Sequence, residues 1–380
     1  MSDTIRALRA REFPWAVSRN HIFLNHASTG PLPQRAVDAL QEATALRAEP
    51  WRFTFEMQFG TLAKARAACA RLVGAEPREI ALMVNTSYGL NLAARALPFE
   101  PGDVVITSDR EYPSNVYPWM ELEVARGVKL ERVPCTGALP DEGAILAALD
   151  RPRVRGLVLS WVSFASGFRI DVERLGRVCR ERGIWFVLDA IQGVGAAPLD
   201  VSKLPVDVVA CGGQKWLLSP WGTGFTYVHP EIMERITPQP VSWMGVRGSD
   251  DFSSLVDYDL TWRADARRFE QITLPFQDFA GMAASLGLLR ELGAESVAAH
   301  VAARVRQLRH GAESAGIPVV TPPGRMAGIV SVRPRDPRAA SARLRDKKVV
   351  HSVREETLRL APHCYSTSTE IELVLEALAG

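Results

Sequence analysis

The sequence has few lysines and no concentrated block of basic residues. Only six of its 45 basic residues are lysine, and the arginines are spread through both halves, which leaves a formal net charge of +2. Proteins that bind the backbone of a nucleic acid usually gather their basic residues into one patch. We therefore expect no nucleic-acid partner.

Long apolar segments and paired cysteine motifs are also missing. No stretch approaches the roughly 18 apolar residues of a membrane-spanning helix, and residues 1–13 lack the apolar core of a signal peptide. The five cysteines stand far apart, without a C-x-x-C pair or the spacing of a disulfide framework. We expect a cytoplasmic protein that does not bind a membrane and holds no metal.

The composition, 47% hydrophobic and 23% charged over 380 residues, is that of a globular protein large enough for two domains. Short β-branched runs alternate with segments of helical period, which predicts an α/β fold: a mainly parallel seven-stranded sheet with helices on both faces. The expected strands are Ile80–Val84, Val104–Thr107, Leu130–Val133, Gly156–Ser160, Ile184–Leu188, Val206–Ala210 and Phe225–Val228. The clearest helices are Ser87–Leu97, Ser114–Ala125 and Val172–Arg182.

From about Phe276 the pattern changes to a long helical region rich in Ala, Leu and Arg. Short strands are expected near Ile317–Val320, Gly328–Val332 and Val349–Val353, and a last helix over Glu370–Leu378. This predicts a smaller α+β domain at the C-terminus. We expect a large domain over residues 21–274 and a small domain formed by residues 1–20 and 275–380.

Lys215 has a setting unlike that of the other lysines. It follows the apolar run Val206–Ala210 and a Cys-Gly-Gly-Gln turn, and Trp-Leu-Leu comes after it. Glycines allow the backbone to approach a ligand closely, and partial burial helps an amine to lose its proton. Although a lysine in a turn is usually a surface residue, these flanks favour a nucleophilic amine.

Asp189 ends the apolar strand Trp185–Leu188. A carboxylate at the end of a buried strand needs a partner, and a protonated pyridine nitrogen would satisfy it. The alternative, an Asp that caps a helix N-terminus, is equally compatible with this motif.

Two further strand ends carry polar or aromatic residues. Asn85, Thr86 and Ser87 stand between a strand and a helix, where hydroxyls and free N–H groups could hold a phosphate or merely cap the helix. Tyr112 follows the strand Val104–Thr107 and could stack on a flat heterocycle, although an aromatic there often belongs to the core.

Seven short segments follow one another in an order typical of a known family. They are Phe23-Leu-Asn-His-Ala-Ser-Thr-Gly-Pro-Leu-Pro33, Asn85-Thr-Ser-Tyr-Gly, Glu111-Tyr-Pro-Ser-Asn, Asp189-Ala-Ile-Gln192, Gly213-Gln-Lys-Trp216, Arg268-Phe-Glu-Gln-Ile-Thr273 and Leu358-Arg-Leu-Ala-Pro-His-Cys-Tyr365. The ordered set, which spans nearly the whole chain, resembles the class V aminotransferase family of fold-type I pyridoxal-phosphate enzymes, with isopenicillin N epimerase-like and cysteine desulfurase-like members.

The resemblance implies pyridoxal 5′-phosphate as the cofactor, bound by the large domain. Lys215 would form the Schiff base, Asp189 would pair with the pyridine nitrogen, Gln192 would contact the ring 3′-oxygen, and Tyr112 would stack on the ring. The implied phosphate ligands are Thr86, Ser87 and Gln214, with Thr273 reaching the phosphate of the neighbouring subunit in a homodimer.

The resemblance also implies a small-molecule amino-acid substrate. Arg359 matches the arginine that binds the substrate carboxylate, a task that suits its planar fork; its alternative is a salt bridge at the rim. Asn25 and His26 lie in the N-terminal segment that lines the substrate pocket in the family.

Two positions depart from the family pattern. Gly212 stands where relatives often carry a phosphate-binding serine. Residues 335–358 contain no cysteine that could form a persulfide, and Cys364 lies after Arg359 rather than before it. The second departure disfavours desulfuration through a protein persulfide.

The motifs predict a shared first step, in which the freed Lys215 removes the Cα proton of the substrate. Transamination or epimerisation of a specialised amino acid is our leading expectation, and β-elimination of the C–S lyase type is the alternative. Gly193-Val-Gly195 after a strand superficially resembles a dinucleotide-binding turn, but it lacks the third glycine. A non-catalytic protein of this fold is a further alternative, which the joint presence of Lys215, Asp189 and Arg359 opposes.

Overall fold

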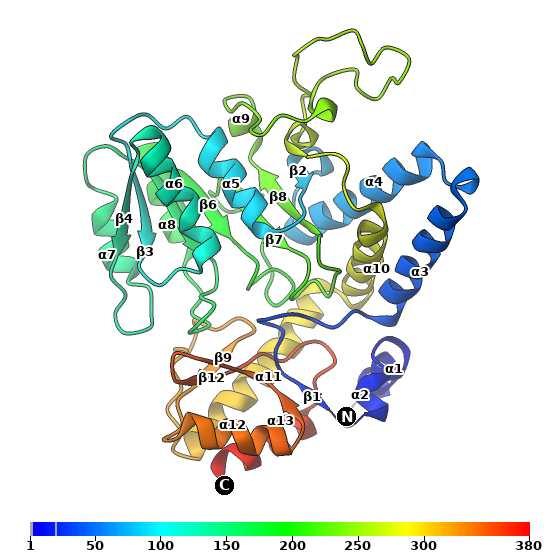
Figure 1. Cartoon of the computed structure of the whole chain (residues 1–380). Helices are drawn as coiled ribbons and strands as arrows, with labels where there is room; N and C mark the ends of the chain where they lie inside the picture. The colour runs from blue at the N-terminus through cyan, green and yellow to red at the C-terminus, as the bar shows by residue number, and fades with distance from the viewer. Residues whose placement is uncertain (1–2, 20) are drawn as a thin grey trace.

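The computed structural model describes residues 3–19 and 21–380. In that part of the chain, no helix is both long enough and apolar enough to cross a membrane. A large sheet with its helices occupies one half of Figure 1, and a smaller group of strands and helices occupies the other half.

The large sheet has seven strands in the order β2-β8-β7-β6-β5-β3-β4. They are β2 (Ile80–Leu82), β3 (Val104–Ser108), β4 (Lys129–Val133), β5 (Val154–Ser160), β6 (Trp185–Asp189), β7 (Val208–Gly212) and β8 (Gly224–Val228). Only β8 runs against the others. All seven strands were expected, although β4 is mostly polar, and the mainly parallel seven-stranded sheet is confirmed.

Helices cover both faces of this sheet (Figure 1). They are α5 (Thr86–Ala96), α6 (Tyr117–Arg126), α7 (Glu142–Ala148), α8 (Val172–Arg182) and α9 (Pro230–Met233). Side chains alternate between the faces of a strand: on β6, Val187 belongs to the apolar cluster of α5, whereas Phe186 and Leu188 belong to that of α8. Because both faces are covered, the inner strands are mainly apolar, whereas the edge strand β4 is mostly polar.

Helix α8 shows how local sequence sets an element. Asp171 accepts a hydrogen bond from the Arg174 N–H at the N-terminus, and Gly183 ends the helix with a φ of 65°. Between them, residues such as Leu175 and Cys179 form a buried stripe at helical spacing. The helix has the bounds that its sequence predicts.

Further helices flank the sheet on the side of β2 (Figure 1). They include α3 (Gln34–Ala48), α4 (Phe55–Val73) and α10 (Phe276–Leu292), and α10 packs against both of the others. At the N-terminus lie α1 (Asp3–Glu12) and α2 (Trp15–Ser18). Short 3-10 helices span Pro50–Arg52, Pro77–Glu79, Pro113–Asn115, Trp243–Gly245 and Ala266–Phe269.

The smaller region is α+β, as expected. It has the antiparallel sheet β11-β12-β9 and a parallel pair between β1 and β10. Its elements are β1 (Ile22–Phe23), α11 (Ala294–Ser314), β9 (Val330–Val332), α12 (Pro337–Asp346), β10 (Val349–Val350), β11 (Ser352–Arg354), β12 (Thr357–Leu360) and α13 (Ser368–Ala379).

The strands of this region differ in part from expectation. The strand expected over Ile317–Val320 is wrong: only Val319 forms an isolated bridge, to Val332. Pro318 lacks an N–H for a ladder, and Pro322 follows closely. The strand expected over Val349–Val353 is divided into β10 and β11.

The N-terminal segment connects the two regions. Leu24 donates its N–H to Val350 O and accepts from the Ala361 N–H, and Gly30 then donates to Gln214 O at 2.8 Å. Residues near both ends of the chain therefore meet beside Lys215. The division at residues 20 and 274 stays a prediction.

Candidate active site

Lys215 lies in the turn that follows β7, close to the C-terminal edge of the parallel strands, where ligands bind in open α/β sheets. The turn is held on both sides of the lysine, because Gly30 donates to Gln214 O and Leu218 donates to Lys215 O at 3.2 Å. Burial lowers the pKa of the Lys215 ammonium to about 8, although the nearby Asp189 opposes this. The amine is therefore easier to deprotonate than an exposed lysine.

Asp189 is the last residue of β6, and 3% of it is exposed. One carboxylate oxygen accepts a hydrogen bond from the Ile191 N–H at 3.0 Å, and within the described residues no donor reaches the other oxygen. Burial raises the pKa of this carboxyl to about 6. A turn rather than a helix follows Asp189, so the helix-cap interpretation is wrong. The same turn rules out a dinucleotide-binding helix after Gly195.

Thr86, Gly212 and Gln214 meet at the N-terminus of α5. Asn85 caps this helix by accepting the Tyr88 N–H, and the Gly212 N–H donates to Thr86 Oγ1 at 2.8 Å. A Cβ atom on Gly212 would lie 2.5 Å from Gln214 Oε1 and 3.1 Å from Thr86 Oγ1, so the Gln214 amide lies directly over this glycine and beside the Thr86 hydroxyl. The positive end of the helix dipole makes the space in front of this N-terminus suitable for an anion.

Ser87 and Tyr112 flank this space. Ser87 donates its hydroxyl to Ser114 Oγ at 2.9 Å, which ties α5 to the turn that carries Tyr112. The Tyr112 ring is 45% exposed and meets Phe164 edge to face, with 5.3 Å between centroids. Lys215 Nζ lies 5.6 Å from the centre of the Tyr112 ring. One face of this ring is therefore available beside the lysine.

Gln192 is buried between Trp216 and the N-terminal segment. Its Oε1 accepts the indole N–H of Trp216 at 3.1 Å, and its Nε2 donates to Ala27 O at 2.9 Å. An amide nitrogen has two hydrogens, so one N–H of Gln192 is left for a ligand.

Arg359 lies on β12 and is only 2% exposed. It donates from Nε to Ser352 Oγ at 3.0 Å, from one terminal nitrogen to Phe164 O at 2.6 Å, and from the other to Ser28 Oγ at 2.8 Å. No carboxylate pairs with it among the described residues. Burial, with the charge of Arg354, lowers the pKa of the guanidinium to about 10. Such a buried and unpaired cation is not a salt bridge at a rim.

The other three predicted residues have different settings. Asn25 accepts the Ser28 hydroxyl at 2.8 Å and bridges to Ala361, so it lies beside Arg359. His26 is fully buried, and both of its ring nitrogens already have partners within the chain. Thr273 is exposed beyond the Ala266–Phe269 turn, and no hydrogen bond in the described residues joins it to the rest of the site.

Glu111 and His363 stand beside this site, but sequence reasoning gave them no role. The Glu111 carboxylate accepts hydrogen bonds from the Ser160 N–H and hydroxyl and from Asn115, which fixes the turn of Tyr112 next to the end of β5. Burial, aided by the charge of Asp189, raises its pKa. In the sequence, the only sign of a role for Glu111 was its position directly before Tyr112. For His363 the only sign was its place in the last family motif.

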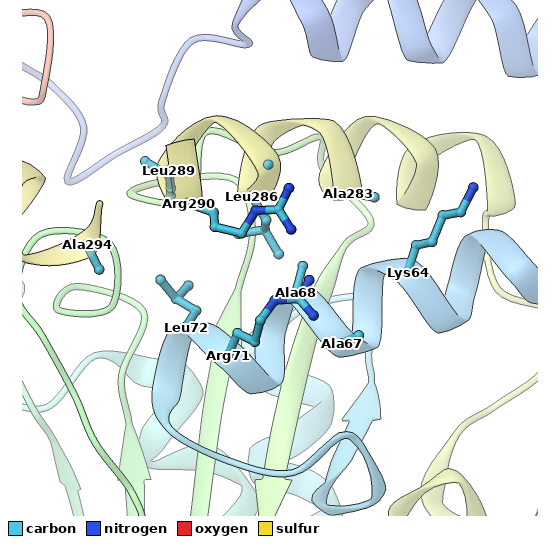
Figure 2. A pocket seen from close by; sticks show the side chains of 11 residues that line it. Lys64, Ala67, Ala68, Arg71, Leu72, Ala283, Leu286, Leu289, Arg290 and Ala294 are labelled. Atoms are coloured by element: carbon cyan, nitrogen blue, oxygen red, sulfur yellow. The ribbon is translucent and has the colours of Figure 1, made fainter. Parts of the chain in front are cut away.

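A separate pocket of about 460 Å³ lies between α4 and α10 (Figure 2). Lys64, Arg71 and Arg290 surround an apolar floor that includes Leu72 and Leu286. None of the predicted site residues lines this pocket, so it is distinct from the candidate active site.

The fold and site define a class: an α/β protein with a lysine of lowered pKa, a buried aspartate and a helix N-terminus at the end of a mainly parallel sheet. Residues 22–344 match the family described as Aminotransferase class-V, and the chain belongs to this family. It is therefore a pyridoxal-phosphate-dependent enzyme, and the predicted family, fold type and cofactor are confirmed.

Relatives with several activities match this chain. It is 29% identical to a probable cysteine desulfurase of Methanothermobacter thermautotrophicus over 95% of this chain and 96% of that protein. It is 35% identical to isopenicillin N epimerase of Streptomyces clavuligerus over 58% of this chain and 56% of that protein. A solved structure of a C-DES mutant with glycine covalently linked to its PLP cofactor shares the fold: TM-score 0.89, 24% identity, and 98% of each chain covered.

The residues present fit pyridoxal phosphate. Asp189 has one carboxylate oxygen without a partner among the described residues for a cationic ring nitrogen, and the N-terminus of α5, with Thr86 in its first turn, suits a phosphate. Lys215, with its lowered pKa, lies 5.6 Å from the centre of the Tyr112 ring and close enough to Asp189 for their charges to interact. These observations do not depend on the resemblance.

Proposed function

We propose that this enzyme removes the Cα proton of a specialised α-amino acid and completes a transamination or an epimerisation. The observation that carries this proposal is the buried, unpaired guanidinium of Arg359 near Lys215, whose ammonium it disfavours. A buried arginine without an anion within the chain calls for an anion from the ligand. A substrate carboxylate supplies it.

Arg359 has the right number of free donors for this task. A guanidinium has five N–H groups, and three of them are used by Ser352, Phe164 and Ser28. One N–H remains on each terminal nitrogen. These two form the fork that binds both oxygens of a carboxylate. Asn25, which accepts a hydrogen bond from Ser28, helps to hold this geometry.

Bound pyridoxal phosphate would supply an electron sink for negative charge at Cα. Lys215 would hold it covalently, and its freed Nζ, with a pKa lowered to about 8, would take the Cα proton. Asp189 would keep the ring nitrogen protonated, and Tyr112 would cover the ring. The remaining N–H of Gln192 would donate to the ring 3′-oxygen.

The phosphate would lie at the N-terminus of α5. Thr86, Ser87 and Gln214 are its proposed ligands, because Thr86 and Ser87 lie in the first turn of α5 and the Gln214 amide lies beside Thr86. Thr273 is too exposed to belong to this cradle as the chain stands. It would instead reach the phosphate of a second subunit.

A homodimer also agrees with a group of exposed aromatic side chains. Phe55, Trp243 and Phe252 are each more than 40% exposed, and the Phe252 ring lies 4.9 Å from that of Phe55 and 6.1 Å from that of Trp243, between centroids. Apolar groups gathered in this way usually mark an interface. Sedimentation of the holoenzyme tests this, and a monomer at micromolar concentration would contradict it.

β-Elimination of a sulfur-containing amino acid is the second candidate. It is favoured by the relatives named cysteine desulfurases, which match about 95% of the chain. Residues 335–358 contain no cysteine for a protein persulfide. A direct C–S lyase needs none, because the thiol leaves the substrate after the Cα proton is removed.

A product assay separates these fates. The enzyme is supplied with pyridoxal phosphate and a panel of L- and D-amino acids in deuterated water, and the products are identified by mass spectrometry. A keto acid indicates transamination, an inverted and deuterated Cα indicates epimerisation, and pyruvate with a thiol indicates elimination. Borohydride reduction should fix the cofactor to the Lys215 peptide; a cofactor found elsewhere would overturn the proposal.

A further inference from the structure

Three rings form a buried cluster behind Lys215. His26, Trp216 and His363 are each 0% exposed. The centroids of the two imidazoles lie 4.9 Å apart, and each lies within 5.8 Å of the indole. The three residues come from the N-terminal segment, the Lys215 turn and the segment after β12. The cluster therefore joins three distant parts of the chain.

The hydrogen bonds of His363 fix its tautomer. Its Nδ1 accepts the Cys364 N–H at 2.8 Å, so this nitrogen carries no proton. Its Nε2 lies 3.0 Å from Trp216 O, and because a carbonyl only accepts, this nitrogen carries the hydrogen. His363 is therefore a neutral imidazole that serves as donor and acceptor together.

His26 has the opposite tautomer. Its Nδ1 lies 2.8 Å from the carbonyl oxygen of Ala361 and must donate to it. Its Nε2 lies 2.8 Å from Tyr365 Oη and accepts the phenolic hydrogen. Burial lowers the pKa of His26, because a charged ring would be costly in a dry interior. Both rings are thus neutral and fully used, which leaves His26 no free nitrogen for a substrate.

These bonds run between the two functional ends of the site. Trp216 directly follows Lys215, and His363 holds its carbonyl. Ala361 lies two residues after Arg359, and His26 holds its carbonyl. The facing imidazoles therefore connect the turn of Lys215 with the strand of Arg359.

We propose that His26 and His363 are positioning residues that set the distance between the Lys215 amine and the Arg359 guanidinium. The inference rests on the proposed function of those two residues. Apolar rings of the same size would also fill the core, but they would remove the ring N–H groups that donate to the carbonyls of Trp216 and Ala361. The hydrogen bonds of the two imidazoles therefore fix the position of the Lys215 turn relative to the strand of Arg359, which packing alone would not do.

The tautomers can be tested without any ligand. In protein labelled with ¹⁵N at histidine, assigned with His26→Gln and His363→Gln, we expect two neutral rings, protonated at Nδ1 in His26 and at Nε2 in His363. A shared tautomer or a charged ring at neutral pH would overturn the network. This result does not depend on the proposed roles of Lys215 and Arg359.

The positioning role can be tested with two carbonyl reagents that differ by a carboxylate. Aminooxyacetate and methoxyamine both displace Lys215 from the cofactor, which is followed by absorbance. In the native holoenzyme we expect aminooxyacetate to react faster, because Arg359 guides its carboxylate. His363→Phe should lower this rate ratio on the order of tenfold to a hundredfold, since small misplacements have effects of that size.

Conservative and control variants sharpen this test. His363→Gln keeps a donor and an acceptor and should recover part of the ratio. His300→Gln removes another imidazole that is bonded to a carbonyl, that of Ser366 at 2.8 Å, and should leave the ratio unchanged. An unchanged ratio in a folded His363→Phe would overturn the positioning role. A ratio near one in the native enzyme would instead overturn the proposed role of Arg359.

Discussion

The cofactor half and the substrate half of the proposed site are built differently. In the cofactor half, Asp189 ends β6, and Thr86 and Lys215 lie a few residues after β2 and β7, so the parallel topology brings them together. In the substrate half, Arg359 reaches the site only because β12 is joined to the N-terminal segment through Ala361. Cofactor chemistry thus depends on one sheet, whereas substrate binding depends on how separate parts of the chain dock.

The largest effect should come from the cofactor half. Lys215→Ala removes both the covalent attachment and the proposed base, and kcat should fall on the order of 10⁴-fold. Borohydride reduction and peptide mass spectrometry, together with turnover, would measure this. Lys203→Ala is the control, because Lys203 is an exposed lysine paired with Asp200. Substantial activity in Lys215→Ala would show that the chemistry does not depend on this half.

Next in size is a change in the substrate half. Arg359→Lys keeps the charge but loses the planar fork, and kcat/KM for amino acids should fall on the order of 10³-fold, or about 4 kcal/mol. Cofactor attachment to Lys215 should be unaffected. The exposed Arg354→Lys serves as the control. If cofactor attachment is lost as well, the two halves are not separable.

The link between the halves should show in the pH dependence of stability. Burial lowers the pKa of His363 to about 4, from about 6.5 in the unfolded chain. Between these values the unfolded chain binds more protons, so the contribution of His363 is complete above pH 6.5 and is lost as the pH falls towards 4. The free energy of unfolding can be measured for the cofactor-free native protein and for cofactor-free His363→Gln. The difference between the two should shrink by about 3 kcal/mol as the pH falls through this range.

The pH test needs a control because other buried groups titrate in the same range. His310→Gln, in which an exposed ring is removed, corrects for them. A constant difference between native protein and His363→Gln from pH 7 to 4 would show that His363 is not held in the neutral form.

The smallest effect should come from the phosphate cradle. Gly212→Ser puts a Cβ atom 2.5 Å from Gln214 Oε1, which must then move. We expect cofactor binding about tenfold weaker, or about 1.4 kcal/mol, by equilibrium dialysis. Gly287→Ser is the control, since a Cβ there meets nothing within 4 Å. Tighter binding would mean that the new hydroxyl offsets the displaced Gln214.

The strands differ in how well their local sequence predicts them. All seven strands of the large sheet were expected; six are mainly apolar runs, and the edge strand β4 is mostly polar. β12 was missed: Thr357–Leu360 is short, contains Arg359, and follows a hairpin turn with positive φ at Glu355 and Glu356. Its pairing with both β11 and β9 determines that it is a strand.

The candidate site shows the same division. Lys215 and Asp189 could be singled out because apolar runs lead directly to them. His26 could not be understood in this way: its segment matched the family, but its partners, Ala361 and Tyr365, are more than 300 residues away. Glu111 is a similar case. It accepts a hydrogen bond from Ser160, which lies next to Asp189 in the sheet.

The sequence by itself determined the family and the mainly parallel sheet and singled out Lys215 and Asp189, because these follow from local apolar patterns and short motifs. Only the tertiary structure decided that Arg359 is buried without an anion, that Gln214 lies over Gly212 beside Thr86, and that two imidazoles connect the turn of Lys215 with the strand of Arg359. The reason is physical. Burial, desolvation and hydrogen-bond partners belong to groups brought together from distant parts of the chain, and no local pattern records them.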